Sequence, residues 1–411
     1  MSRLNLTALV PVLAALALIT APAAAQDAAQ DTAPLRVLSL GGLTGAASGA
    51  SADLMSARAL VAVEVNAGGG LADGRRLSLE VVDVGCAGAD AQGAEAVASA
   101  AMGASGAVAM LGPVCSDAAL SVARAAIALG APMISDGASS PALSALEDGD
   151  LVFRTAPSDV AMGAALADLA LTRGHARMVV AHAGDAWAEG ITGAFVAAYQ
   201  AAGGVVVAQA LLEEAPGAQD AGLAALDAAG PADALALFAY ADERGIEALR
   251  AVLRRGAWQA VLGADGLLDV AVIDQIGALR LARVTLAAPA PDRAGEAWIR
   301  FAAKAAEVGI DADAPLAAQG YDAAMVMALA LVRSGGQGGA RLAQAIREVT
   351  APGAPPVLPG NWAAARAAAA GGEVRYVGAS GPIRFDAAGD VPGLIASWSA
   401  RGAAWAPSRL R

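Results

Sequence analysis

Two hydrophobic patterns alternate along the chain: short apolar segments, and longer segments with apolar residues three or four positions apart. The first pattern predicts β-strands and the second predicts helices. In order, the first series comprises strand 35–40, helix 50–66, strand 77–83, helix 93–102, strand 108–111, helix 117–128 and strand 132–134. Strands separated by helices pair in parallel through right-handed crossovers, so this series predicts a parallel α/β sheet.

A second series of the same kind follows. It comprises helix 160–172, strand 177–182, helix 190–202, strand 205–211, helix 221–229, strand 234–238, helix 244–255 and strand 260–262. The remaining chain predicts a strand at 284–287, helices 295–307, 317–333 and 339–350, and a pair of strands between 373 and 385. We therefore predict an α/β protein with two doubly wound parallel-sheet lobes joined by a multi-strand hinge.

The tail has too few strands for a further large sheet, and we expect it to complete the two lobes. Lobe I is predicted over residues 35–156 and 289–378, and lobe II over residues 157–288 and 379–405. A hinge that the chain crosses several times favours a ligand cleft between the lobes.

The N-terminus has the pattern of a cleaved export signal. Arg3 precedes an apolar run over residues 6–19, and small residues over 21–25 form the expected cleavage site. We predict a signal peptide over residues 1–25, a polar leader over residues 26–34 and a mature protein in the periplasm. The cleavage site carries no cysteine, so no lipid anchor is expected there.

Composition excludes several classes of protein. The 411 residues include 39 acidic and 27 basic side chains, which gives a formal charge of −12. An acidic excess repels phosphate groups and argues against binding to nucleic acids or to anionic membrane surfaces. The hydrophobic content of 57% is far too high for a disordered chain and supplies enough apolar residues for large cores.

The only cysteines are Cys86 and Cys115. In an oxidising compartment, an isolated cysteine pair is usually a disulfide, and two free thiols are the alternative. A metal site is less favoured, because His175 and His182 have no second nitrogen or sulfur ligand at a helical or hairpin spacing.

No motif for catalysis is found in the sequence. It contains no P-loop, no G-x-S-x-G nucleophile elbow and no H-E-x-x-H zinc motif. Either histidine could act as a general base, but His182 ends a predicted strand and His175 lies in a predicted turn, where a structural role is more common. We therefore predict a protein that is not an enzyme and that needs neither a cofactor nor a metal.

Small hydroxyl residues recur after predicted strands of the first series. Thr44, Ser116 and Ser139 each follow such a strand, and Ser116 also begins a predicted helix. Ligands of open parallel sheets bind beyond the carboxyl ends of the strands. A hydroxyl and free N–H groups at a helix N-terminus can hold a carboxylate. The alternative for each residue alone is an ordinary helix cap or turn.

The order of motifs resembles that of type I periplasmic binding proteins, and most closely the leucine/isoleucine/valine-binding group that serves ABC importers. The resemblance covers essentially the whole mature chain. The segments that carry it are Gly42-Leu43-Thr44-Gly45, Gly68-Gly69-Gly70, Gly112-Pro113-Val114-Cys115-Ser116, Ser135-Asp136-Gly137-Ala138-Ser139-Ser140-Pro141, Phe153-Arg154-Thr155, Gly263-Ala264-Asp265-Gly266, Gly320-Tyr321-Asp322 and Gly381-Pro382-Ile383-Arg384-Phe385-Asp386.

The resemblance implies roles for individual residues. Ser116 and Ser139 would hold the α-carboxylate and α-amino groups of an amino acid, and the Gly137 carbonyl would accept a further bond from the ammonium. Asp265 would complete the ammonium site from lobe II, one carbon shorter than the usual glutamate of the group. A plain turn residue is the alternative for Asp265. Thr44 is a further candidate from lobe I.

The sequence departs from the family pattern around the ligand side chain. Ala50 stands where branched-chain binders often have an aromatic wall, and Trp187 stands where they commonly have tyrosine. Trp187 could close the cleft over a ligand, or it could pack beneath its loop. Tyr240 is a weaker candidate of the same kind.

The resemblance implies the solute-binding component of an ABC importer, which captures a branched-chain-like amino acid or a related small amide. Its partners would be that solute and a permease in the inner membrane, and the protein would be a monomer. The alternatives are a sensor subunit that presents the same cleft to a membrane receptor, and a hydrolase on the same scaffold.

Overall fold

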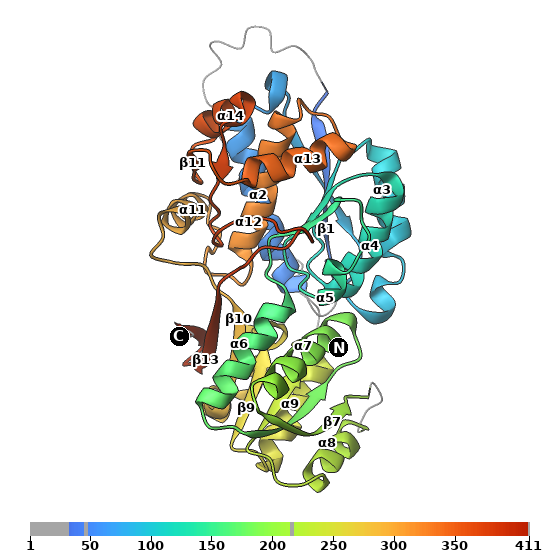
Figure 1. Ribbon diagram of the computed structural model, residues 1–411, viewed down its shortest axis with the longest axis vertical. Coiled ribbons are helices and arrows are strands. Elements are labelled where there is room, and N and C mark those ends of the chain that lie inside the picture. Colours follow the sequence, from blue (N-terminus) through green and yellow to red (C-terminus); the bar gives the residue numbers. More distant parts are fainter. Residues whose placement is uncertain (1–32, 45–47, 214–217, 410–411) are drawn as a thin grey trace, which may run out of the picture. The chain divides into compact units, whose positions relative to one another are not determined.

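The computed structural model describes residues 33–44, 48–213 and 218–409. The predicted signal peptide and nearly all of the predicted leader lie outside the described residues. Contacts between Cα atoms gather Pro34–Arg411 into one compact unit. Its strands form two large sheets and one two-stranded sheet, with helices packed around them (Figure 1).

The first sheet is entirely parallel, with the strand order β2-β1-β3-β4-β5. Its strands are β1 (Leu35–Gly41), β2 (Leu77–Asp83), β3 (Met110–Leu111), β4 (Met133–Ser135) and β5 (Val152–Arg154). The segments between them form α2 (Ser48–Ala67), η1 (Ala72–Gly74), η2 (Gly88–Ala91), α3 (Ala94–Ser105), α4 (Ser116–Leu129) and α5 (Pro141–Ser144). This is the parallel α/β sheet that the first series of hydrophobic patterns predicts.

The second sheet has the order β14-β13-β10-β9-β8-β6-β7 and is parallel from β10 to β7. Its parallel strands are β6 (Arg177–His182), β7 (Val205–Leu211), β8 (Ala234–Phe238), β9 (Ala260–Ala264) and β10 (Val284–Pro289). The helices of this series are α6 (Asp159–Thr172), α7 (Ala186–Ala201), α8 (Ala218–Ala228), α9 (Glu243–Arg255) and α10 (Val270–Ile276), with the short turns η3 (Asp265–Leu267) and η4 (Arg280–Arg283).

The C-terminal part of the chain packs a helix against the elements of the first sheet and adds two strands to the second. It contains α11 (Glu296–Glu307), α12 (Ala317–Arg333), α13 (Gly339–Thr350), β11 (Pro356–Val357), α14 (Trp362–Gly371), β12 (Arg375–Tyr376), β13 (Ile395–Arg401) and β14 (Ala404–Arg409). Helix α12 packs against α2, and every residue from Ala317 to Val332 is buried. The hairpin of β13 and β14 instead extends the second sheet, antiparallel to β10.

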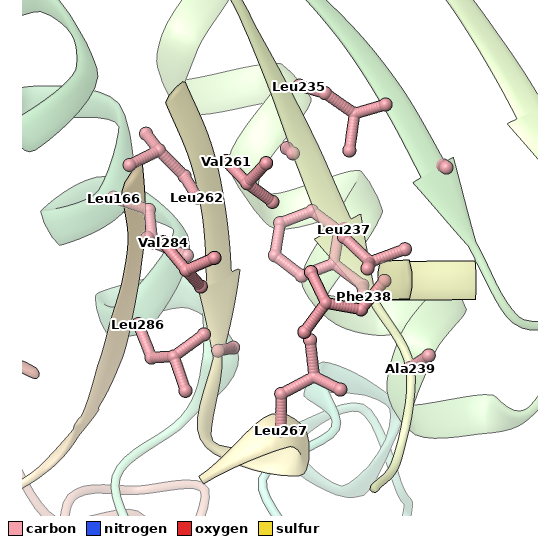
Figure 2. Close-up of a cluster of buried hydrophobic side chains, with 14 of the residues drawn as sticks. Leu166, Leu235, Leu237, Phe238, Ala239, Val261, Leu262, Leu267, Val284 and Leu286 are labelled. Carbon is pink, nitrogen blue, oxygen red and sulfur yellow. The ribbon is translucent and has the colours of Figure 1, made fainter. Parts of the chain in front are cut away.

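Each large sheet has its own buried core. Figure 2 shows the second core, where side chains of β8, β9 and β10 such as Leu237, Val261 and Leu286 pack together. Leu267 of η3 lies at the end of these strands and is fully buried in the same cluster. Because Leu267 is held by the core, the η3 turn that directly follows β9 has a fixed position.

The largest errors of the sequence prediction lie in the tail. Between 373 and 385, where a pair of strands was expected, only β12 forms, and it pairs with β11. Helix α14 and the β13–β14 hairpin are additional elements. The segment around Ser380 is held instead by the buried Asp322 carboxylate, which accepts hydrogen bonds from the N–H groups of Ala379 and Ser380, both 2.8 Å. Those N–H groups are therefore not available to a sheet.

The predicted lobe boundaries stay a prediction. Ala379, Ile383 and Val391 are buried in the cluster around the first sheet, and Ala396 and Trp398 are buried in the cluster around the second. Within the described residues, no helix is both long and apolar enough to cross a membrane.

Candidate functional site

A cavity of about 500 Å³ lies where loops from both sheets meet. From the elements of the first sheet it is lined by Ala50, Asp53, Val114, Cys115, Gly137 and Ser139. From the elements of the second sheet its lining includes Trp187, Tyr240, Asp265, Asp269, Trp398 and Trp405. Most of these residues follow the carboxyl ends of parallel strands, which is where ligands bind in open α/β sheets. We refer to this space as the strand-end cavity.

A buried ion pair organises the loops of the first sheet. The Arg58 guanidinium on α2 donates two hydrogen bonds of 2.6 Å to the Asp136 carboxylate, which directly follows β4. Arg58 also donates to the Ser39 hydroxyl of β1 and to the Leu40 carbonyl, at 3.0 and 2.9 Å. One side chain thereby fixes the ends of β1 and β4 and the start of the loop that carries Gly137 and Ser139.

The predicted disulfide is confirmed: Cys86 and Cys115 are bonded, with their Cα atoms 5.1 Å apart. Cys115 is the residue before α4, so the cross-link holds the N-terminus of that helix at the cavity. The next residue, Ser116, is buried, and its hydroxyl accepts a hydrogen bond of 3.2 Å from the Ser140 N–H. Ser116 and the loop of Ser139 are therefore in direct contact.

A second buried cation holds the far end of the same loop. The Arg154 guanidinium lies 2.6 Å from the Asp390 carboxylate and donates to the Ser140 carbonyl at 2.9 Å. The Ser140 hydroxyl in turn donates to the Ala186 carbonyl of α7 at 3.2 Å, so this loop also contacts the helices of the second sheet.

Aromatic side chains form one wall of the cavity. The rings of Trp187 and Tyr240 lie 4.7 Å apart between centroids. Trp187 packs so closely on Gly266 that a side chain at that position would collide with the indole ring. Burial, followed by nearby carboxylates, raises the pKa of Tyr240 well above its ordinary value, so the phenol stays protonated. Trp187 is buried and lines the cavity, and whether it closes the cleft over a ligand stays a prediction.

Two carboxylates with buried oxygens lie beside this wall, those of the fully buried Asp159 and the partly exposed Asp265. Burial raises the pKa of Asp265 to about 6. Burial also raises the pKa of Asp159, at the start of α6, well above its ordinary value, and the Asp265 charge adds to the shift. The Ser139 side chain favours the charged form of Asp159 and so lowers its pKa. Among the described residues, no donor makes a hydrogen bond of normal geometry to either Asp159 oxygen or to Asp265 Oδ1. The Arg154 charge also favours the charged form of Asp159, and the backbone N–H groups of Asp265 and Gly266 favour that of Asp265, but burial outweighs these contributions and raises both pKa values.

Further carboxylates line the outer part of the cavity. Asp53 on α2 is half-buried, and its pKa is raised first by burial and then by the charges of Asp311 and Asp269. The motifs and hydrophobic patterns of the sequence did not single out these three residues. Their only common signal is the spacing of isolated aspartates after predicted strands or at helix starts, which is also typical of helix caps.

The family model described as "Receptor family ligand binding region" matches residues 55–396. The chain belongs to this family. No curated protein matches its sequence.

Solved structures show which fold this ligand-binding region has. The leucine-binding protein LivK of Thermotoga maritima is similar with a TM-score of 0.73 at 20% identity, over 91% of this chain and 97% of that chain. An ABC transporter substrate-binding protein of Desulfitobacterium hafniense in complex with Leu has a TM-score of 0.71 at 23% identity, over 91% and 100%. A solute-binding protein of R. palustris in complex with benzoate has 0.70 at 18%, over 91% and 95%. At these identities the similarity establishes the fold, that of type I periplasmic binding proteins.

Four of the six predicted ligand residues line the strand-end cavity. Gly137, Ser139, Trp187 and Asp265 line it. Ser116 is one contact away, through Ser140. Thr44 is exposed and is not among the lining residues, although Gly45, which follows it, lies outside the described residues. Whether these side chains bind a ligand stays a prediction. His175 and His182 are not among the described residues that line the cavity.

Proposed function

We propose that this chain is the extracytoplasmic solute-binding component of an ABC importer. It captures an amino acid of the branched-chain type, or a related small amide, and delivers it to a permease in the inner membrane. The observation that supports this most directly is the strand-end cavity of about 500 Å³, to which both sheets contribute. Cavities of this size suit ligands of this class.

Differential affinity provides the mechanism. Ser139, the Gly137 carbonyl and the region of Ser116 meet the solute from the first sheet, and Asp265 and Trp187 meet it from the second. A solute that contacts both sets stabilises the arrangement in which both are close, and it thereby shifts the population of conformers. The permease then needs only to distinguish loaded from empty protein.

The proposal is tested by identifying what the protein carries. Mass spectrometry of small molecules released by denaturing the purified protein is expected to show one nitrogen-containing solute near equimolar amounts. Adding that solute at 100 times its dissociation constant adds about 2.7 kcal/mol to the free energy of unfolding, which calorimetry can measure. Hydrolysis of candidate amides or esters during the incubation would instead support the hydrolase on this scaffold.

The export signal and the monomeric state belong to the same proposal. N-terminal sequencing of the protein from a periplasmic fraction is expected to begin at Gln26, and analytical ultracentrifugation is expected to give the monomer mass. The description of the family as a receptor region favours one alternative, a sensor subunit. Cross-linking in membranes separates the two, because the importer component is captured with a permease and the sensor subunit with a membrane receptor.

A further inference from the structure

The charges that line the strand-end cavity are all of one sign. Its lining includes Asp53, Asp265, Asp269, Asp311 and Asp313, and among the described lining residues none is Lys, Arg or His. A zwitterion has a carboxylate as well as an ammonium group. A cavity with this lining stabilises an ammonium group and disfavours an additional carboxylate.

One aspartate that lines the cavity, Asp265, and one that does not, Asp159, have buried carboxylate oxygens without a hydrogen-bond donor among the described residues. Asp159 is fully buried with both oxygens unsatisfied, and Asp265 Oδ1, at the cavity wall, is also buried without a donor. Isolated buried carboxylates are strongly unfavourable, so such groups normally have a partner. The negative charges of these two groups instead repel each other, and the Asp265 charge therefore raises the pKa of Asp159 further.

The arginines close to the cavity are bound to other carboxylates, although the Arg154 charge also lowers the pKa of Asp159. Arg154 is bound to Asp390 at 2.6 Å. Arg293 lies behind Trp398 and forms an ion pair with Asp313 at 2.8 Å. Of the lining aspartates, only Asp313 therefore has a cationic partner among the described residues.

The outer carboxylates have no such partner. Asp53 makes no ion pair or side-chain hydrogen bond among the described residues, while Asp269 accepts a bond from the Ala271 N–H at 2.7 Å and Asp311 accepts one from the Asp313 N–H at 2.9 Å. Backbone N–H groups carry only partial charges, so the outer carboxylates of Asp53, Asp269 and Asp311 together remain negative.

The aromatic wall suits the same kind of ligand. Trp187 and Tyr240 stand beside Asp265, and Trp405 lies near Asp269, whose carbonyl accepts a hydrogen bond of 2.8 Å from the Trp405 indole N–H. Indole and phenol faces attract ammonium groups through their quadrupoles. Carboxylates next to aromatic faces favour an organic cation over an organic anion.

We infer that the strand-end cavity takes a solute with net positive charge at neutral pH, either an amine or a basic amino acid, in preference to a neutral zwitterion or an organic anion. This inference rests on the proposed solute-binding function and replaces its branched-chain-like solute with a cationic one. One ammonium group of the solute lies at Asp265 beside Trp187. The outer carboxylates, which include Asp53, attract any second positive charge of the solute.

Matched pairs of solutes test the inference by isothermal titration calorimetry on the mature protein. Norleucine is lysine without its side-chain ammonium group, and 3-methylbutylamine is leucine without its carboxylate. The cationic member of at least one pair is expected to bind at least tenfold more tightly than its neutral partner, and 4-methylpentanoate is expected to bind most weakly. The pair that shows the preference identifies a basic amino acid or a simple amine as the source.

Isosteric substitutions of single aspartates show which carboxylate causes the preference for cationic solutes. Asp53→Asn is expected to lower the affinity for lysine about fivefold and to leave norleucine unchanged. Asp168→Asn, on the exposed face of α6, is the matched control and is expected to change neither.

The outcomes that overturn the inference differ from those that overturn the proposed function. Leucine, norleucine or 4-methylpentanoate binding as tightly as the cations would overturn the inference and leave the solute-binding function intact. Stabilisation by calcium alone would also overturn it. If no compound binds and no solute is released from the purified protein, both proposals fail.

Discussion

The two sides of the strand-end cavity satisfy their buried charges in different ways. On the side of the first sheet, Asp136 is paired with Arg58 and Asp390 with Arg154, each at 2.6 Å. On the side of the second sheet, Asp159 and Asp265 are buried with unsatisfied oxygens. The same residue type therefore has two roles. Paired aspartates hold the loops in place, and the unpaired Asp265 lines the cavity, where a ligand can supply the missing charge.

The largest expected effect comes from breaking a compensated pair. Asp136→Asn leaves the buried Arg58 guanidinium without a counter-charge, which is expected to lower the free energy of unfolding by about 3–5 kcal/mol in urea denaturation. Glu95→Gln removes the partner of Arg124 in an exposed pair and is the control, with an expected change below about 1 kcal/mol. Similar small losses in both variants would show that the Arg58 pair does not hold the loops.

Removing the disulfide affects the same side by another route. The double variant Cys86→Ser, Cys115→Ser releases a constraint across 29 positions of the unfolded chain. The expected loss is about 3 kcal/mol, measured by the same denaturation. Wild-type protein under reducing conditions is expected to match the variant, and a variant as stable as the oxidised protein would contradict the prediction.

Removing an uncompensated charge is expected to have the opposite effect on stability. Asp265→Asn relieves a buried charge, so the unliganded protein is expected to gain on the order of 1 kcal/mol in free energy of unfolding. Affinity for the preferred solute is expected to fall about a hundredfold, equivalent to about 2.7 kcal/mol. Loss of stability together with unchanged affinity would mean that Asp265 is a structural turn residue.

Acidification is expected to reproduce this variant in part. The pKa of Asp265 is about 6 in the folded protein against an ordinary value of 3.8, so the folded state binds more protons than the unfolded state between these values. The contribution of Asp265 to stability therefore increases as the pH falls from 7 to 4. Affinity for a cationic solute falls over the same range.

The change in affinity between pH 7 and pH 5 is expected to be about tenfold, because about one Asp265 carboxyl in ten remains ionised at pH 5. Asp159, which faces Asp265 from α6, also has a raised pKa and adds to the loss. Tyr240 stays protonated throughout. Calorimetry gives the solute affinity of wild type and of Asp265→Asn at each pH, and the difference between the two pH profiles is the contribution of Asp265. Parallel profiles would contradict the prediction that Asp265 causes the loss of affinity.

The smallest expected effect concerns Ser116. Its hydroxyl accepts one hydrogen bond from the Ser140 N–H, so Ser116→Ala is expected to lower the free energy of unfolding by about 1 kcal/mol. Solute affinity is expected to fall about fivefold, because the Ser139 loop loses a contact and the predicted carboxylate site loses a hydroxyl. Ser121→Ala, farther along α4, is a control for binding. Equal affinity in Ser116→Ala and wild type would remove Ser116 from the site.

Much of the fold could be predicted from the sequence because its signals are local. Strands 177–182, 205–211 and 234–238 have the predicted bounds, since each is a short apolar run between turn residues. The β13–β14 hairpin was missed because its residues carry serine and alanine between the tryptophans. Such a pattern defines a strand only once β10 is present as its neighbour.

Residues of the candidate site that stand in a motif were easier to predict than the others. Gly137 and Ser139 stand in a motif and could be recognised by sequence alone. The Arg58–Asp136 pair joins residues 78 positions apart, and Asp53 and Asp159 look like ordinary helix residues. Their importance comes from what surrounds them in space, which a single sequence does not reveal.

The position of α12 in the chain has a consequence for synthesis. This helix packs on α2 beside the first sheet, but it is translated only after all five strands of that sheet and five strands of the second. A nascent chain that stops before Ala317 therefore exposes apolar surface along α2 that the finished protein covers. Chaperone binding to the nascent chain is therefore expected to last until α12 has emerged.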